Sequence, residues 1–282
     1  MSLITTPSST RAREIELDAL KQKHRAIWAS GDYPAVVRDV VRPLGPVLVH
    51  AAGIVSGERV LDVAAGDGNA AIPAAAFGAS VTASDLTPEL LDAGRVRAAQ
   101  EGVTLAWEQA DAESLPYADG AFDVVISSLG VMFAPHHQMA ADELVRVTRS
   151  GGRIGLLSWT PQGFIGRMFA AMKPFLPAPP PGAQPPPLWG DPAHVGALLG
   201  DRVIDVEWRR DRLRVDRFAT AEEFVAFFKA NYGPTVAAYR NQGGDPDRIQ
   251  ALDRTLREVA SDHFVAASDM SWEYLLLTAV RA

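Results

Sequence analysis

The middle of the chain alternates short apolar strands with helices, and this alternation constrains the fold more than any other feature. Strands are predicted at residues 59–63, 80–84, 103–108, 122–127 and 153–159. Helices are predicted among them at residues 69–77, 88–100 and 138–149. Strands that are joined through helices of this length form βαβ units, whose right-handed crossovers build a parallel sheet. We therefore predict a doubly wound, mostly parallel α/β sheet.

The regions on either side of this core, which spans residues 54–160, differ from it in pattern. Residues 1–13 are rich in Ser, Thr and Pro and are predicted to be a disordered tail, and residues 14–53 have the apolar spacing of two or three helices. Residues 161–282 are predicted to complete the sheet, with strands at 202–208, 212–218 and 272–280 and helices at 191–199, 220–230 and 247–264. Eight prolines within residues 174–187 predict an extended connection that is either a linker or a lid over a binding site.

Composition argues against several kinds of site and partner. The chain has no cysteine, so disulfides, thiolate zinc sites and cysteine nucleophiles are excluded, and no metal site is predicted. The net charge of −7 argues against a nucleic-acid partner, because phosphate binding needs a clustered basic surface. Five arginines that lie close together are interpreted as the solvated side of a strand pair: Arg209, Arg210, Arg212, Arg214 and Arg217. No stretch approaches the roughly 18 apolar residues of a membrane helix, and no signal peptide is evident, so we expect a soluble cytoplasmic protein without a membrane partner.

The loop after the first strand has the sequence DVAAGDGN over residues 62–69. Ligands of a parallel sheet bind beyond the carboxyl ends of its strands, and Gly66 and Gly68 leave room for a ligand to approach the backbone and for tight packing into the following helix. The nicotinamide and flavin pattern G-x-G-x-x-G is not met, because Ala64 and Ala71 stand where its outer glycines would be. The loop contains no Lys or Arg, which also excludes a phosphate-binding Walker loop.

Carboxylates lie at the ends of three successive strands. Asp62 and Asp67 would repel a pyrophosphate in a low-dielectric cleft but favour an ammonium or sulfonium. Asp85 lies 17 residues after Gly68, where it can accept hydrogen bonds from two ribose hydroxyls, although a charge at a helix N-terminus would also explain it. After the third strand, Asp111 can accept a hydrogen bond from an adenine amino group, unless this segment is an ordinary turn. Together these acids predict a cationic, phosphate-free cofactor.

Four segments, taken in order, resemble the class I S-adenosylmethionine-dependent methyltransferases, especially the ubiquinone/menaquinone-biosynthesis-like (type 11) branch. The segments are VLDVAAGDGN (60–69), VTASDLTPELL (81–91), DAESLPYADGAFDVVISSLGVMF (111–133) and ELVRVTRSGGRIGLLSW (143–159). The resemblance implies a seven-stranded Rossmann-like sheet, S-adenosyl-L-methionine as the cofactor, and a substrate and lid region in residues 161–282. The sequence departs from the family loop D-x-G-x-G-x-G at Ala64 and Asp67.

The resemblance also implies a role for each piece of the site. The predicted cofactor-binding residues are Tyr33, Asp62, Ala64, Gly66, Gly68, Asn69, Asp85, Leu86, Asp111, Ala112, Ser127 and Ser128. The glycine loop and Asp62 would lie at the methionine and ribose, and Asp85 would bind the ribose hydroxyls. Leu86 would pack on the adenine. Asp111 and the N–H of Ala112 would form hydrogen bonds with the edge of the adenine. Ser127 or Ser128 would offer a carbonyl to the methionine ammonium, and Tyr33 or Trp28 would close the site.

The predicted activity is methyl transfer to an O, N or C atom of a small molecule, with the oligomeric state left open. A general base is needed only if the acceptor loses a proton, and His136 and His137 are candidates, although we interpret them rather as surface residues that open a helix. Apolar residues after the fifth strand form either an acceptor pocket or core: Trp159, Phe164, Met168, Phe169 and Phe175. The same choice applies to Met132 and Phe133. Two alternatives are a non-catalytic protein that binds S-adenosylmethionine and, less favoured, a nicotinamide-dependent oxidoreductase.

Overall fold

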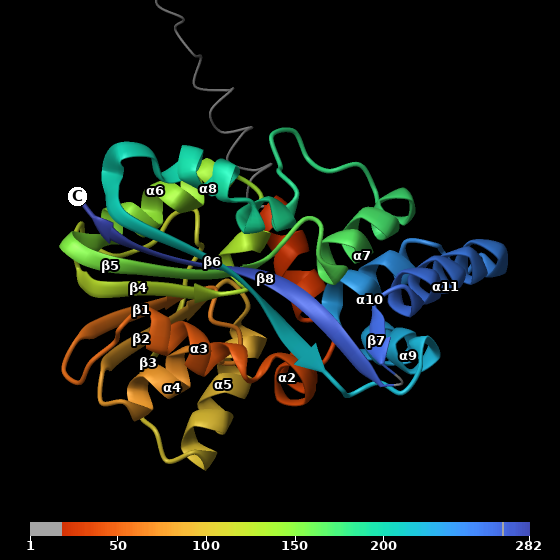
Figure 1. Ribbon diagram of the computed structural model, residues 1–282, viewed down its shortest axis with the longest axis horizontal. Coiled ribbons are helices and arrows are strands. Elements are labelled where there is room, and N and C mark those ends of the chain that lie inside the picture. Colours follow the sequence, from red (N-terminus) through yellow and green to blue (C-terminus); the bar gives the residue numbers. More distant parts are fainter. Residues whose placement is uncertain (1–18, 267) are drawn as a thin grey trace, which may run out of the picture.

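The structure is a computed structural model that describes residues 19–266 and 268–282 (Figure 1). The predicted tail, residues 1–13, lies outside the described residues, as do residues 14–18 of the predicted helical region. Residues 19–28 are helical. In the part of the chain that the structure describes, no helix combines the length and the apolar character that a bilayer crossing requires.

The fold is built on one twisted, mostly parallel sheet, as the sequence predicts. Its strands are β1 (Arg59–Val63), β2 (Ser80–Asp85), β3 (Ala106–Gln109), β4 (Phe122–Ser128), β5 (Thr148–Trp159), β6 (Val203–Val215), β7 (Phe264–Ala266) and β8 (Asp269–Arg281). Among the described residues, seven strands follow the order β3-β2-β1-β4-β5-β8-β6, and the short β7 adds an eighth by pairing with β8. The strands β3, β2, β1, β4 and β5 are parallel, whereas β8 runs antiparallel to its three partners β5, β6 and β7.

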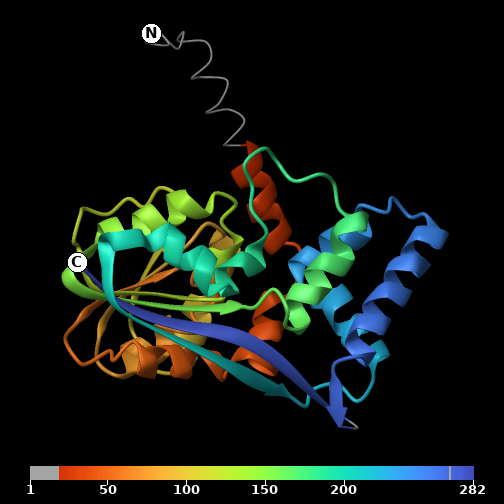
Figure 2. The same ribbon diagram turned by 45° about the horizontal axis from the view of Figure 1, so that its top comes forward.

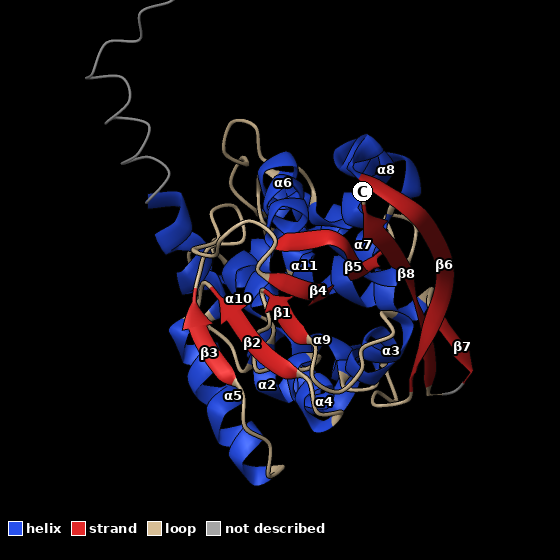
Figure 3. Ribbon diagram, turned by 90° about the vertical axis from the view of Figure 1, so that its left-hand side faces the viewer, coloured by secondary structure: helices blue, strands red, loops and turns tan. Residues whose placement is uncertain are grey.

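Helices cover both faces of this sheet. They are α2 (Tyr33–Val36), α3 (Leu44–Ala51), α4 (Ala71–Ala76), α5 (Pro88–Gln100), α6 (His137–Val147), α7 (Phe164–Met172), α8 (Pro192–Leu199), α9 (Ala221–Asn231), α10 (Gly233–Arg240) and α11 (Pro246–Ser261). Helices α3, α4 and α5 lie on one face, and α6 and α8 lie on the other (Figures 1 and 3). The helices α7, α9, α10 and α11 gather at one end of the molecule, toward which the strands β1 to β5 run (Figure 2). The carboxyl ends of the parallel strands therefore face this group of helices.

Several predicted boundaries are wrong, and each error has a local cause. Residues 202–218 contain one strand, β6, instead of two, with a bulge near Asp205, whose φ is +51°. The charged residues that suggested a break lie on an edge strand, where they point into solvent without interrupting the pairing with β8. Helix α10 was not predicted, because Gly233 and Pro234 look like a turn in the sequence. Pro234 instead occupies the first turn of the helix, where the missing N–H costs nothing.

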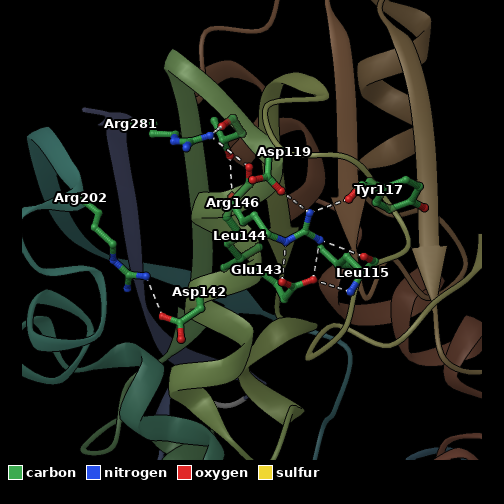
Figure 4. Close-up of polar contacts among 10 residues, drawn as sticks. Leu115, Tyr117, Asp119, Asp142, Glu143, Leu144, Arg146, Arg202 and Arg281 are labelled. Atoms are coloured by element: carbon green, nitrogen blue, oxygen red, sulfur yellow. Dashed lines mark hydrogen bonds and ion pairs between the residues drawn. The ribbon is translucent and has the colours of Figure 1, made fainter.

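One arginine of α6 holds the connection between β3 and β4 against this helix (Figure 4). The guanidinium of Arg146 donates to the carbonyls of Leu115 at 2.9 Å and Tyr117 at 2.6 Å. It also pairs with the carboxylate of Glu143 at 2.7 Å, and the same carboxylate accepts the N–H of Leu115 at 2.6 Å. The connection that carries the predicted adenine-reading segment is thus held by charge-assisted hydrogen bonds.

We expect Arg146→Met to lower the free energy of unfolding by about 3 kcal/mol, because the substitution leaves two carbonyls and a carboxylate without their donor. Urea denaturation followed by circular dichroism measures this change. Arg38→Met is a suitable control, because among the described residues Arg38 pairs only with the adjacent Asp39, on the surface, and its loss should change stability far less. Equal effects of the two substitutions would contradict the proposed fastening by Arg146.

Candidate functional site

A cavity lies at the carboxyl ends of the parallel strands. Its floor comes from the loops after β1, β2 and β4, and one side comes from the segment after β3. Its remaining wall comes from the helical residues 19–28, of which Lys21, His24 and Trp28 line it. This is the position of a ligand site in an open α/β fold.

Nine of the twelve predicted cofactor-binding residues line this cavity. They are Tyr33, Ala64, Gly66, Asn69, Asp85, Leu86, Asp111, Ala112 and Ser128. The other three, Asp62, Gly68 and Ser127, lie beneath its surface. Ser127 has its hydroxyl engaged within the sheet, where it donates to the carbonyl of Val63 at 2.6 Å and accepts the N–H of Val131 at 2.9 Å. None of residues 174–187 lines the cavity, although Gln184 N donates to the carbonyl of Pro135, which does.

Asp85 holds the shape of the glycine loop. One carboxylate oxygen accepts the N–H of Gly66 at 2.8 Å, and the other accepts the N–H of Thr87 at 2.8 Å. Burial raises the pKa of Asp85, and these amide hydrogen bonds oppose that rise. Each oxygen has a second lone pair, so the carboxylate can still accept hydrogen bonds from a ligand in the cavity.

Gly68 is required for packing within the protein. Its φ is +84°, and a Cβ there would lie 2.6 Å from the ring of Trp107 and 3.2 Å from Ile72. The same ring lies against Gly94 of α5, where a Cβ would approach it to 2.3 Å. The second glycine of the loop therefore makes room for an indole from β3, which the sequence pattern could not reveal.

Ala64 adopts a conformation that favours glycine, because its φ is +54°. A left-handed backbone costs a residue with a Cβ roughly 1–2 kcal/mol, and the greater freedom of glycine in the unfolded chain offsets part of that cost. We expect Ala64→Gly, which restores the family loop, to raise the free energy of unfolding by about 0.5–1 kcal/mol in urea denaturation. Ala65→Gly, at a position without positive φ, should instead lower stability. A loss of stability in both variants would contradict the strain at Ala64.

The two acids of the loop do not face the cavity in the way the sequence suggests. Asp67 is buried and pairs with Arg97 of α5 at 3.4 Å, so much of its charge is compensated within the protein. Asp62 is 1% exposed, and neither of its carboxylate oxygens has a hydrogen-bond partner among the described residues. Burial raises the pKa of Asp62 to about 8, and the nearby carboxylates of Asp85 and Asp67 add to this rise. Asp62 and Asp67 therefore offer a ligand less negative charge than their place in the sequence suggests.

Two polar atoms on the cavity wall are buried and have no hydrogen-bond partner among residues 19–266 and 268–282. They are Oδ1 of Asn69 and Oγ of Ser128. The amide nitrogen of Asn69 donates to the carbonyl of Val41 at 3.1 Å, which fixes the side chain with its oxygen free. Buried polar atoms are normally paired, so these two indicate a polar ligand group at this end of the cavity.

At the opposite end, Asp111 is already paired on one side. Its Oδ1 accepts from Nζ of Lys21 at 2.9 Å and from the N–H of Glu113 at 3.0 Å. Lys21 and His24 were not predicted as site residues, because no motif surrounds them and only tertiary packing places their helix here. Burial, with the charge of Lys21 adding to it, lowers the pKa of His24, so this imidazole is neutral near pH 7.

Comparisons with known proteins agree with this geometry. Residues 61–156 match the family model described as a methyltransferase domain. Over 270 residues, 96% of this chain and 97% of the relative, the chain is 52% identical to the uncharacterized protein Rv1405c of Mycobacterium tuberculosis. Over 105 residues, 37% of this chain and 42% of the relative, it is 41% identical to a demethylmenaquinone methyltransferase of Clavibacter sepedonicus. The chain belongs to the class I S-adenosylmethionine-dependent methyltransferases.

Solved structures share the fold of this methyltransferase at low sequence identity. The YcgJ protein of Bacillus subtilis has a TM-score of 0.56 at 18% identity and covers 83% of this chain and 96% of its own. The [4+2]-cyclase SpnF has a TM-score of 0.54 at 20% identity, over 85% of this chain and 81% of its own. These similarities concern the architecture alone, because one fold can support many different reactions.

The two histidines that were considered as bases do not line the cavity of the methyltransferase. Nδ1 of His136 lies 3.0 Å from Oε2 of Glu113, and the N–H of His136 donates to the other oxygen at 2.7 Å. The interpretation of both as surface residues is wrong for His137, which is fully buried, with Nδ1 2.9 Å from Nε2 of His194. Its ring packs against Trp189, and the sequence around it does not indicate this tertiary contact.

The end of the cavity farthest from Lys21 along helix 19–28 is aromatic. The ring centroid of Trp28 lies 4.7 Å from that of Phe133 and 5.3 Å from that of Tyr33. All three residues line the cavity. Tyr232 and Phe169 pack behind them. The other aromatic and sulfur-containing residues considered for a pocket, Trp159, Phe164 and Met168, are buried in the core, as is Met132. Of the considered apolar residues, Phe133 lines the cavity, whereas Phe169 and Phe175 only pack against the core.

Proposed function

We propose that this methyltransferase transfers a methyl group from S-adenosylmethionine to a small, largely apolar acceptor. The observation that carries the proposal is the division of the cavity into a polar part and an aromatic end. The polar part offers Asp85 and Asp111 as acceptors of hydrogen bonds, together with the unpaired oxygens of Asn69 and Ser128. The aromatic end is formed by Trp28, Tyr33 and Phe133 and has no charged side chain among the described lining residues. A charged acceptor would lose its hydration there without compensation.

The polar groups match the parts of the cofactor in their order along the cavity. Asp85 would bind the ribose hydroxyls, Leu86 would pack on the adenine, and Asp111 with Ala112 would read the adenine edge. Asn69 and Ser128 would hold the methionine end, where the backbone of Gly66 also comes to the surface. When bound, the cofactor supplies a methyl group on a sulfonium. The protein then contributes orientation and the exclusion of water, and the acceptor would be oriented by the aromatic end.

A nicotinamide cofactor fits the same cavity less well. Its pyrophosphate needs donors or cations, and Lys21, the one lysine among the described residues that line the cavity, is already paired with Asp111 and Glu113. Asp85 at the glycine loop adds negative charge near the place where a pyrophosphate would lie.

Calorimetric titration with S-adenosylhomocysteine and, separately, with NADH tests the cofactor part of the proposal. We expect binding of S-adenosylhomocysteine and none of NADH, and the reverse result would overturn the proposal. A screen of metabolite extracts with methyl-labelled cofactor then tests the transfer itself. Transfer of label into an uncharged small molecule is expected. Binding of S-adenosylhomocysteine without transfer to any extract would favour a non-catalytic protein that keeps the cofactor site.

A further inference from the structure

One face of the helix formed by residues 19–28 covers the cavity. Lys21, His24 and Trp28 follow one another at helical spacing and all line the cavity. Trp28 anchors one end of this face among aromatic rings. Lys21 anchors the other end through ion pairs to the segment after β3. The helix is therefore fixed to the body of the protein at both ends of the cavity.

The ammonium of Lys21 is shared between two carboxylates. It lies 2.9 Å from Oδ1 of Asp111 and 2.6 Å from Oε2 of Glu113. The side chains of Lys21 and Glu113 are 12% and 1% exposed, so this cation has little contact with solvent. Glu113 in turn accepts the N–H of His136 and contacts its ring, which ties the cluster to the start of α6. A cation at this place supplies the positive charge of a lysine to a carboxylate that is buried.

The pairing fixes the orientation of Asp111. Oδ1 of Asp111 receives two donors, Lys21 Nζ and Glu113 N, while the side chain stays 25% exposed beside the cavity. No hydrogen bond to Oδ2 is formed within the described residues, so this oxygen is the one available to a ligand. The other basic residues of the same helix face elsewhere: Lys23 is exposed, and Arg25 pairs with Glu89 at the surface.

We propose that Lys21 is a positioning residue that presents Asp111 to the 6-amino group of adenine and thereby makes the site select adenine over hypoxanthine. This inference rests on the proposed function, which places the adenine beside Asp111. Adenine offers an amino donor and a ring-nitrogen acceptor on this edge, whereas hypoxanthine offers a carbonyl acceptor and an N–H donor. Both contacts, to the carboxylate of Asp111 and to the N–H of Ala112, would therefore be mismatched with hypoxanthine. A freely rotating carboxylate would impose this choice less strictly.

The test compares the dissociation constants of S-adenosylhomocysteine and S-inosylhomocysteine, its hypoxanthine analogue, by calorimetry on the full chain. We expect the wild-type protein to prefer the adenine ligand at least about tenfold. Lys21→Met should reduce that preference at least about threefold. Lys23→Met, a lysine change on the exposed side of the same helix, should leave it unchanged. Asp111→Asn should reduce the preference further, because the amide can donate to the carbonyl of hypoxanthine, while the N–H of Ala112 still favours adenine.

The ratio of the two dissociation constants distinguishes positioning of Asp111 by Lys21 from a general effect on the helix 19–28, which covers the cavity. Displacement of this helix alone would weaken the binding of both ligands by the same factor. An unchanged ratio in Lys21→Met would therefore overturn the inference while leaving the proposed function intact. Absence of S-adenosylhomocysteine binding to the wild-type protein would instead overturn the proposed function and, with it, the inference. If Lys21→Met does not fold because Glu113 loses its cation, Lys21→Met combined with Glu113→Gln removes both charges and carries the same expectation.

Discussion

Replacement of Asp85 by alanine is expected to weaken the binding of S-adenosylhomocysteine by at least tenfold, or about 1.4 kcal/mol. The carboxylate has two tasks that the substitution removes together. It would accept hydrogen bonds from the ribose hydroxyls, and it already accepts the N–H groups of Gly66 and Thr87, both at 2.8 Å. An orphaned buried N–H costs about 1–3 kcal/mol, so the glycine loop should lose order as well. Calorimetric titration measures the weakening of binding.

A ligand that lacks the 2′-hydroxyl separates the two tasks. The wild-type protein should prefer S-adenosylhomocysteine over its 2′-deoxy analogue, and Asp85→Ala should bind both equally, because the partner of that hydroxyl is gone. Asp92→Ala, an exposed acid on the following helix, should keep the wild-type preference. If Asp85→Ala still distinguished the two ligands, the carboxylate would not be the group that binds the hydroxyl, and its part would be confined to the loop.

The sheet and the position of the site could be predicted because both depend on local pattern. Short apolar strands between helices specify the parallel sheet, and the carboxyl ends of such strands meet at one edge. The residues that end β2 and follow β3, Asp85 and Asp111, consequently line the same cavity although they are 26 positions apart. Their placement follows from topology, so no knowledge of side-chain packing is needed to expect it.

Of the helix 19–28, which covers the cavity, only Trp28 could be predicted as a site residue, through the family resemblance, because tertiary contacts alone place Lys21 and His24 there. Residues 19–28 have a helical pattern but no motif, and their position depends on ion pairs to Asp111 and Glu113 and on the aromatic contacts of Trp28. The same limit explains Gly68, which a ligand motif seemed to account for and which in fact accommodates Trp107. Sequence spacing identifies which groups share an edge of the sheet, but it does not show which of them are already occupied by other residues.

Asp62 shows this limit most clearly, and it gives the second prediction of large effect. The folded-state pKa of about 8 lies above the ordinary value of 3.8 because the carboxyl group is buried. Between these values the folded protein holds a proton that the unfolded chain has released, so stability falls as the pH rises. Between about pH 5 and pH 7, Asp62 should lower the free energy of unfolding by about 1.4 kcal/mol per pH unit. Over the whole range between its two pKa values, the loss should be on the order of 5 kcal/mol. Above about pH 8 the loss should level off.

Asp62→Asn isolates this effect, because Asp67 and Asp85 also have raised pKa values and contribute in the same direction. Urea denaturation of the ligand-free protein at a series of pH values measures the free energy of unfolding. As the pH rises, this free energy should fall less in Asp62→Asn than in the wild type. The side chain of Asp119 is 77% exposed, so the stability of Asp119→Asn should depend on pH in the same way as that of the wild type. If Asp62→Asn also showed the pH dependence of the wild type, Asp62 would be ionised in the folded protein, and its charge would then be available to a cationic cofactor. If the curves diverge, the ligand-free loop holds Asp62 as a neutral acid, and Asp85 is left as the main anionic group facing the ribose and the methionine end.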